Sequence, residues 1–168
     1  LLDYLGLLVK WNKVFNLTAV RDVDEMVSRQ ILDSLSILPW LKGARVLDVG
    51  TGAGLPGIPL AIAKPDMAFT LLDSNGKKTR FVQQAVIELG LNNVEVMNQR
   101  IEAFQDAAGF EVITSRAFAS LDDFVDNTTH LLAPGGSWLA MKGQREREEE
   151  ICPAGVRLTH HPLDVPGC

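Results

Sequence analysis

This sequence has few cysteines, and it has neither a long apolar run nor an excess of positive charge. The 168 residues include two cysteines and three histidines, and Cys152 and Cys168 share no Cys-x-x-Cys spacing with each other or with a histidine. This pattern indicates neither a disulfide framework nor a metal site. No apolar stretch reaches the length of a membrane span, and the N-terminus lacks the basic-then-apolar order of a signal peptide. We therefore expect a cytoplasmic protein with no membrane partner.

The net charge of −5 argues against the simplest class of nucleic-acid binder, although it does not exclude one. Neutralising phosphates requires a concentrated positive surface. Cations do cluster locally, after Asp73 and after the last apolar segment of the predicted core: Lys77, Lys78 and Arg80, then Lys142, Arg145 and Arg147. Glutamates are interleaved with the second cluster, which favours an exposed helix or loop there.

The most informative segment that is present runs from Leu47 to Leu55, where an apolar strand passes through an acid into a turn with glycine at every second position. Gly50, Gly52 and Gly54 let the backbone turn with no Cβ facing a ligand. Asp48 places a negative charge just before the first of them. The pattern indicates a loop that holds an adenosine-bearing cofactor.

Strands and helices alternate from this loop onward. The sequence predicts helices near 57–63, 76–89 and 121–131, and strands at 45–49, 68–73, 93–98, 110–115, 137–142 and 156–162. This alternation predicts an α/β fold, Rossmann-like and doubly wound, with a mostly parallel sheet.

An N-terminal helical extension precedes the sheet. One helix is expected to end near Phe15, and a second follows the capping-box spacing of Asp22 to Glu25 and runs to about Leu38, where Pro39 stops it. We expect one domain over residues 1–168, with the helices in 1–42 and the Rossmann-like core in 43–168.

Two classes of cofactor fit the glycine loop. Residues 52–57 satisfy the G-x-G-x-x-G pattern of dinucleotide sites, in which a pyrophosphate faces a helix N-terminus. A sulfonium cofactor instead carries an amino acid whose ammonium needs an acceptor, which Asp48 offers. Asp73, at the end of the next predicted strand, suits the ribose of either class. The segment 130–140 favours the sulfonium cofactor. It reads as a helix end, a Pro-Gly-Gly turn and a strand, and together with the glycine loop and Asp73 it makes residues 45–142 resemble the class I methyltransferases. That resemblance implies S-adenosylmethionine.

Ligands on such a sheet lie beyond the carboxyl ends of the strands. After the third predicted strand, Ile101 and Glu102 offer a backbone amide and an acid that could reach an adenine. After the fourth comes Arg116, whose guanidinium is costly to desolvate unless it meets a ligand or a carboxylate. A structural ion pair of Arg116 with Asp48, Glu102 or Asp122 is the alternative interpretation.

The end of the fourth strand restricts the methyl acceptor. Residues 115–118 read Ser-Arg-Ala-Phe, where enzymes that methylate exocyclic amines carry an Asn/Asp-Pro-Pro-Tyr/Phe turn. Neither cysteine follows a strand near the loop, which disfavours methylation at a pyrimidine C5. Lys142 could assist a ribose hydroxyl, but its companion acid is not evident. Guanine N7 has a free lone pair and no proton to lose, so it mainly has to be aligned with the sulfonium methyl.

Segments outside the generic fold carry a more specific resemblance; they are 11–22, 31–35, 50–60, 72–74 and 115–121. Over residues 10–143 the chain closely resembles the bacterial 16S ribosomal RNA guanine-N7 methyltransferases, the glucose-inhibited division protein B family. The resemblance implies methylation at N7 of one guanine in 16S rRNA, with S-adenosylmethionine as the donor and no metal.

The resemblance also implies where the cofactor binds: at Gly50, Leu55, Asp73, Ile101, Glu102 and Arg116, to which the glycine pattern adds Asp48, Gly52 and Gly54. It leaves the catalytic residues open, and the candidates are Asn16, Arg116 and Lys142.

Asn16, Thr18 and Arg21 match the family's Asn-Leu-Thr-x-x-Arg segment, which we expect to cover the cofactor pocket or to meet RNA. A turn at a helix C-terminus is the alternative for Asn16. Asp33 and Ser34 are expected to brace this segment. Phe118 and Trp138 could stack on a base, although aromatic residues beside strands usually pack in the core.

The family continues past Cys168 into a strand with an Arg-His pair, and this chain begins inside a helix, so we expect a chain truncated at both ends. Two other functions stay open: a small-molecule methyltransferase, and a noncatalytic S-adenosylmethionine-binding RNA-assembly factor. Because the chain is acidic, we expect the 30S subunit or an assembly intermediate to supply much of the RNA recognition.

Overall fold

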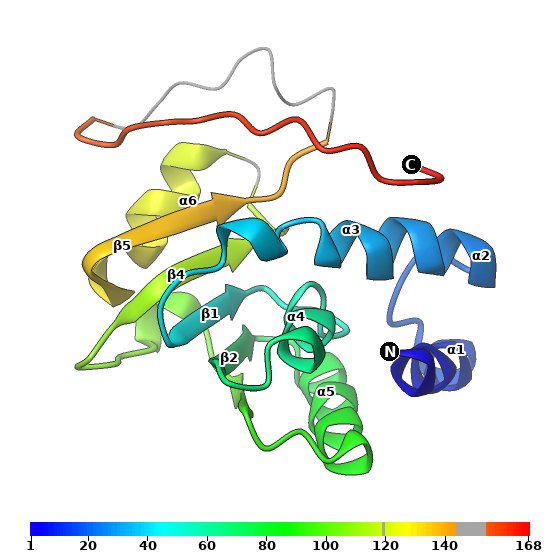
Figure 1. The fold of residues 1–168 in the computed structure, drawn as a ribbon. Coiled ribbons are helices and arrows are strands. Elements are labelled where there is room, and N and C mark those ends of the chain that lie inside the picture. Colours follow the sequence, from blue (N-terminus) through cyan, green and yellow to red (C-terminus); the bar gives the residue numbers. More distant parts are fainter. Residues whose placement is uncertain (119, 144–153) are drawn as a thin grey trace.

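The computed structural model describes residues 1–118, 120–143 and 154–168 (Figure 1). Its centre is a five-stranded parallel sheet in the order β3-β2-β1-β4-β5. The strands are β1 (Arg45–Val49), β2 (Ala68–Asp73), β3 (Val94–Asn98), β4 (Phe110–Ser115) and β5 (Leu132–Ala140). The predicted α/β, doubly wound, parallel architecture is therefore confirmed. From β1, the strand order runs outward to β2 and β3 on one side and to β4 and β5 on the other. Such a change in strand order opens a crevice beyond the strands' carboxyl ends.

Alternation along the strands builds two apolar cores, because successive side chains point to opposite faces of a sheet. On one face, strand residues pack against helices α1 (Leu2–Phe15), α4 (Gly57–Ala63) and α5 (Gly76–Leu89): Val46, Phe69, Leu71 and Val112. On the other face they pack with Phe104 and with helix α6 (Leu121–Thr128): Leu47, Val49, Leu72 and Ile113. Asp48 shares the first face with Val46, so its carboxyl is directed under the glycine loop.

The N-terminal extension forms helices at the predicted places. After α1 come α2 (Val23–Met26), a π-helix (Val27–Leu32) and α3 (Asp33–Leu35) in direct succession. Asp22 caps this stretch as predicted, because its Oδ1 accepts from the amide of Glu25 at 3.0 Å. The predicted stop at Pro39 is wrong: the α/π stretch ends at Leu35, and Pro39 lies within a 3-10 helix, Leu38–Trp40.

The last predicted elements differ most from the structure. β5 begins at Leu132 rather than 137, and the expected Pro-Gly-Gly turn is a bulge inside it, since Leu132 pairs with Phe110 and Ser137 with Val112. Proline is tolerated in a strand at such a bulge. The helix predicted to 131 ends at Thr128 and continues as a 3-10 helix, Thr129–Leu131.

The predicted strand 156–162 is wrong. These residues form no strand and are exposed except for the half-buried Val156, so an extended pairing there would bury little apolar surface. The charged run at 144–150, with Arg145 and Arg147, and also Cys152, lie outside the described residues. Cys168 is an exposed free thiol. Within the described ranges no helix is long and apolar enough to cross a membrane.

Candidate cofactor site

The glycine loop sits at the carboxyl end of β1, beside the ends of β2 and β4. The amides of Gly50 and Thr51 donate to the carbonyl of Leu72 in β2, at 2.8 and 3.1 Å. Gly50 and Gly52 have φ angles of +68° and +58°, which residues with a Cβ rarely adopt. A Cβ on Gly50 would lie 2.5 Å from the Cβ of Ala117 beyond β4, whereas one on Gly52 would meet nothing within 4 Å. The loop is therefore packed at Gly50 and open at Gly52, where a ligand can approach the backbone.

Asp48 is buried under this loop, with 1% of its surface exposed. Its Oδ2 accepts from the hydroxyl of Thr51 at 2.8 Å and from the amide of Gly57 at 2.9 Å. Its Oδ1 is buried and has no hydrogen-bond partner among the described residues. Burial raises the pKa of Asp48 to about 7, although the two hydrogen bonds and Arg116 oppose this and Asp73 adds to it. One carboxylate oxygen thus braces the loop, and the other accepts no hydrogen bond from the described residues.

Asp73 ends β2 and ties that strand to the loop. Its Oδ2 accepts from the amide of Gly52 at 2.8 Å, and its Oδ1 accepts from the amide of Asn75 at 2.8 Å. A carboxylate offers about four acceptor positions, so two backbone donors leave room for hydroxyl donors. The carboxylate is half-buried beside the open position at Gly52, which fits the predicted role of holding a ribose.

The ends of β3 and β4 contribute the remaining predicted residues. Ile101 and Glu102 lie in a 3-10 helix, Ile101–Ala103, after β3; Ile101 packs against the second core, and Glu102 is exposed. Beyond β4, the hydroxyl of Ser115 donates to the carbonyl of Val49 at 2.8 Å and accepts from the amide of Ala117 at 3.0 Å. Both links hold the chain after β4 against the glycine loop.

Arg116 forms an ion pair, but not with a predicted partner. Its Nη1 lies 3.7 Å from Oδ2 of Asp33 in α3, and the two side chains are 33% and 28% exposed. The alternative pairing with Asp48, Glu102 or Asp122 is therefore wrong. No local pattern identifies Asp33 as the partner, because α3 lies far before β4 in the chain and only packing brings the two together. Burial raises the pKa of Asp33, and Arg116 opposes that rise.

Lys142 and the two aromatic candidates have structural contacts. The ammonium of Lys142 donates to the carbonyl of Phe118 at 2.9 Å and so joins the end of β5 to the segment after β4. Phe118 packs on Phe124 with ring centroids 5.3 Å apart. Trp138 donates to the hydroxyl of Thr128 at 2.9 Å. Both aromatic rings lie against the second core, in agreement with the core interpretation.

Asn16 ends α1 in a left-handed conformation with φ +49°, which is the helix-terminal turn that the alternative interpretation describes. Its Oδ1 accepts from the guanidinium of Arg21 at 2.6 Å. Thr18 is held from two sides, because its hydroxyl oxygen accepts from the side-chain amide of Gln30 at 2.5 Å and its own amide donates to Asn12 at 3.0 Å. Contact of these residues with a cofactor or RNA stays a prediction.

Tyr4 is the contact that sequence reasoning missed. Its hydroxyl donates to the carbonyl of Ala53, in the middle of the glycine loop, at 2.7 Å. Both residues are buried, and Tyr4 is fully inaccessible. The spacing to Leu8, one helical turn later, predicts that Tyr4 lies on the buried face of α1, but nothing in the sequence identifies the acceptor.

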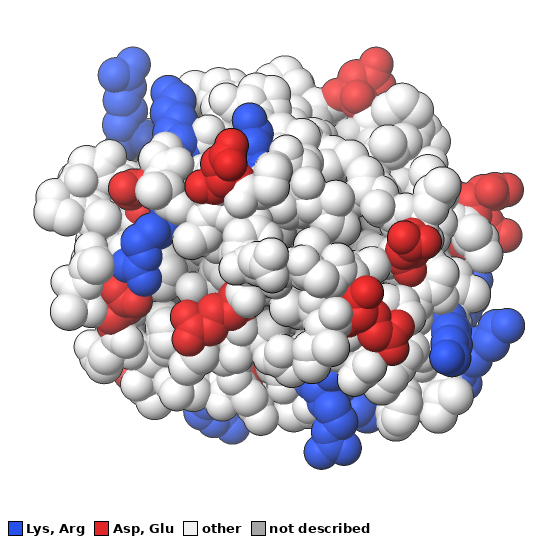
Figure 2. Space-filling view, turned by 60° about the horizontal axis from the view of Figure 1, so that its bottom comes forward, with Lys and Arg blue, Asp and Glu red and all other residues white. Residues whose placement is uncertain are grey.

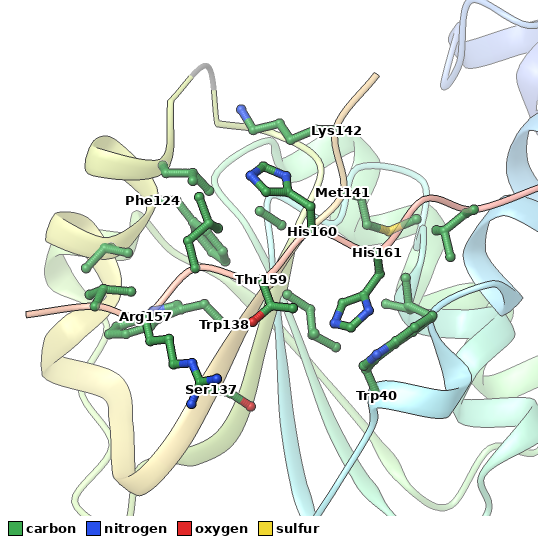
Figure 3. A pocket seen from close by; sticks show the side chains of 18 of the residues that line it. Trp40, Phe124, Ser137, Trp138, Met141, Lys142, Arg157, Thr159, His160 and His161 are labelled. Carbon is green, nitrogen blue, oxygen red and sulfur yellow. The ribbon is translucent and has the colours of Figure 1, made fainter. Parts of the chain in front are cut away.

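A separate cavity of about 580 Å³ lies between β5 and residues 155–163 (Figure 3). Trp40 and His161, which both line it, are in contact with ring centroids 4.6 Å apart. Its lining includes Asp33 and Lys142 but no residue of the glycine loop and not Asp73. The cofactor residues therefore form a different site, and the two approach each other near the Arg116–Asp33 pair.

The structure brings most of the predicted cofactor residues to one edge of the sheet. Asp73 contacts the loop directly, and Arg116 influences the pKa of Asp48 beneath it. Ile101 and Glu102 follow β3, at the same edge. In the described part of the chain, no cluster of three or more His, Cys, Asp or Glu side chains is arranged to hold a metal.

Two solved structures with a similar arrangement are named as methyltransferases. A SAM-dependent methyltransferase from Thiobacillus denitrificans, in complex with S-adenosyl-L-homocysteine, matches with a TM-score of 0.52 and 22% identity over 65% of this chain and 46% of that one. A SAM-dependent O-methyltransferase from Thermotoga maritima matches with a TM-score of 0.57 and 18% identity over 68% of this chain and 45% of that one. At these identities the likeness shows the fold alone.

Sequence relatives are far closer. Ribosomal RNA small subunit methyltransferase G of Stutzerimonas stutzeri is 58% identical over the whole of this chain and 80% of its own length. The same-named proteins of Ectopseudomonas mendocina and Legionella pneumophila are 57% and 52% identical, over 100% and 99% of this chain and 80% of each relative. A family model described as GidB, rRNA small subunit methyltransferase G, matches residues 1–160. The chain belongs to the rRNA small subunit methyltransferase G family.

Proposed function

We propose that the protein transfers the methyl group of S-adenosylmethionine to N7 of one guanine in 16S rRNA. The observation that carries the cofactor part is the buried, unpartnered Oδ1 of Asp48 beneath a glycine loop that is open at Gly52. A buried carboxylate oxygen without a donor is costly, and a cationic amino group is the natural complement. Family membership supports ribosomal RNA of the small subunit as the acceptor.

Different residues of the chain would bind different parts of the cofactor. Asp48 would accept from the ammonium of the methionine part, and Gly50, Gly52, Gly54 and Leu55 would present backbone to it. Asp73 would accept from the ribose hydroxyls, and Ile101 with Glu102 would flank the adenine. When bound, the cofactor supplies a methyl group on a positively charged sulfonium.

The groups near the end of β4 and β5 suit an acceptor that loses no proton. Arg116 and Lys142 are cationic and engaged with Asp33 and with the carbonyl of Phe118, so neither is placed as a general base. Guanine N7 requires none, because its lone pair attacks directly. Catalysis then rests on orienting the base and excluding water, and Arg116, Asn16 and Lys142 are the residues we propose for that orientation.

The charge distribution supports an assembled particle as the acceptor. On the face shown in Figure 2, basic and acidic side chains are interspersed rather than gathered into one positive surface. Together with the net charge of −5, this offers little attraction for free RNA phosphates. We propose that the 30S subunit or an assembly intermediate contributes much of the recognition. A cytoplasmic location stays a prediction.

The test is transfer of a tritiated methyl group from S-adenosylmethionine to 30S subunits and to naked 16S rRNA, both prepared from cells that lack this protein. We expect 7-methylguanosine in the rRNA, identified by mass mapping, and faster labelling of 30S subunits. Label in a metabolite extract but not in rRNA would favour the small-molecule alternative. Cofactor binding without any transfer would favour the assembly factor, and equal rates on both RNA substrates would refute the role of the particle.

Replacing Arg116 with alanine is expected to lower S-adenosylhomocysteine affinity or kcat at least tenfold while the fold persists. The ion pair with Asp33 is partly exposed and 3.7 Å long, so its loss costs roughly 1 kcal/mol of stability or less. Calorimetric titration, turnover and the thermal midpoint should be measured together. The matched control is Asp33→Asn, which removes the ion pair but keeps the guanidinium. Unchanged kinetics in Arg116→Ala would leave the residue a structural ion-pair partner only.

A further inference from the structure

The glycine loop is held by side chains from three different elements. Asp48 of β1 binds Thr51, Asp73 of β2 binds Gly52, and Tyr4 of α1 binds Ala53, so each of three consecutive loop residues has a side-chain partner from a different element. The first two contacts come from the sheet that forms the core of the fold. The third comes from the N-terminal extension, 49 residues earlier in the chain.

The contact from Tyr4 is one of two hydrogen bonds that hold one peptide plane of the loop. The peptide between Ala53 and Gly54 donates from its N–H to the carbonyl of Thr51 at 2.9 Å and accepts at its C=O from Tyr4. Gly54 has φ +95°, and a glycine can adopt angles of either sign. Without the tyrosine hydroxyl, the carbonyl of Ala53 would remain buried and unpaired, and only the bond from the Gly54 amide would hold this peptide plane.

The surroundings keep the hydroxyl a donor. Tyr4 is completely buried, and burial, with the nearby Asp48, raises its pKa so that the phenol stays neutral. The ring itself packs in the first core with Leu8 of the same helix. The ring therefore contributes to the stability of α1, and the hydroxyl is left with one acceptor, which belongs to the loop.

We propose that Tyr4 is a positioning residue for the cofactor: its hydroxyl sets the orientation of the Ala53–Gly54 peptide and thereby shapes the loop before the cofactor arrives. This inference rests on the proposed binding of S-adenosylmethionine at the glycine loop. It assigns part of the N-terminal extension to cofactor binding rather than to RNA alone. Because a loop that is already ordered loses less entropy on binding, we expect removal of the hydroxyl to lower the affinity for the cofactor.

The test is Tyr4→Phe in the full chain, which keeps the ring and removes only the hydroxyl. We expect the Kd for S-adenosylhomocysteine and the KM for S-adenosylmethionine to rise about tenfold, the size of one lost hydrogen bond, with kcat at saturating cofactor unchanged. Hydrogen exchange of the amides of residues 52–55 should become faster in the protein without ligand. The control is Leu8→Val, which loosens α1 in the same core but removes no hydrogen bond to the loop.

Three results would overturn the role of Tyr4 in positioning the loop. An unchanged Kd and unchanged loop exchange in Tyr4→Phe would overturn the proposal, and so would failure of this variant to fold, because the hydroxyl would then serve the fold itself. Equal weakening by Leu8→Val would also overturn it, since any loosening of α1 would suffice. If the unaltered protein did not bind S-adenosylhomocysteine, the proposed cofactor site would fail, and the exchange rates of the loop would still decide whether Tyr4 holds it.

Discussion

Replacing Asp73 with alanine is expected to weaken binding of S-adenosylhomocysteine about a hundredfold or more. The carboxylate receives the amide of Gly52 at the open position of the loop, and hydroxyl donors of a ribose would add to it. Hydrogen bonds to a charged group contribute about 1.5–3 kcal/mol each, so two of them correspond to at least two orders of magnitude. Calorimetric titration measures the change directly.

The chain offers a matched control for Asp73 in the turn that precedes the same strand. Asp66 is exposed in the turn that precedes β2, at the opposite end of the sheet, so Asp66→Ala removes the same charge without touching the loop. This control should bind as the unaltered protein does. Asp73→Asn separates charge from shape, because its amide nitrogen would face a backbone N–H. Undiminished binding by Asp73→Ala would exclude the ribose role.

The second prediction concerns pH and the buried Asp48. Burial raises the pKa of this carboxyl to about 7, and a cationic ligand favours its ionised form. Affinity for S-adenosylhomocysteine should therefore increase about five- to tenfold from pH 6 to pH 7.5, following ionisation of the carboxyl. In Asp48→Asn, the affinity should be at least tenfold lower at pH 7.5 and should change little across this range. Titrations of both proteins at several pH values measure the difference.

Stability should depend on pH with the opposite sign. The folded protein holds the proton of Asp48 more tightly than the unfolded chain, whose aspartate titrates near its ordinary value of 3.8. The folded state therefore binds more protons between about pH 4 and pH 7, and the contribution of Asp48 to the free energy of unfolding falls as pH rises through that window. Asp48→Asn should remove this contribution. If the stability of the unaltered protein rose with pH across this window, or if it fell equally in Asp48→Asn, the buried carboxyl would not be the group responsible.

The fold was largely predictable because its signals are local. Strands β1 to β4 alternate or run apolar between polar turns, and helix α5 starts at the capping Asn75 and ends at Gly90. The wrong predictions concern segments whose structure depends on tertiary packing. β5 contains proline and glycine in a bulge against β4, and residues 156–162 form no strand although their pattern allowed one. That residues 1–168 form one domain stays a prediction.

The candidate site was predictable where it depends on the ends of strands. Parallel strands bring their carboxyl ends to one edge, so Asp48, Asp73 and Arg116 could be grouped from sequence alone. Contacts from the N-terminal extension could not, because α1 and α3 are far from the loop along the chain and reach it through packing on α4 and α5. Asp33 beside Arg116 and Tyr4 beneath Ala53 are the two results of that packing.

The sequence by itself determined the parallel sheet, the glycine loop and the acids around it, since these follow from periodicity and from backbone angles that glycine adopts easily. Only the tertiary structure decided which oxygen of Asp48 has no donor among the described residues, which acid faces Arg116, and that a tyrosine from the first helix holds the loop. These features depend on where distant side chains meet, and that is set by the packing of whole elements rather than by any local pattern.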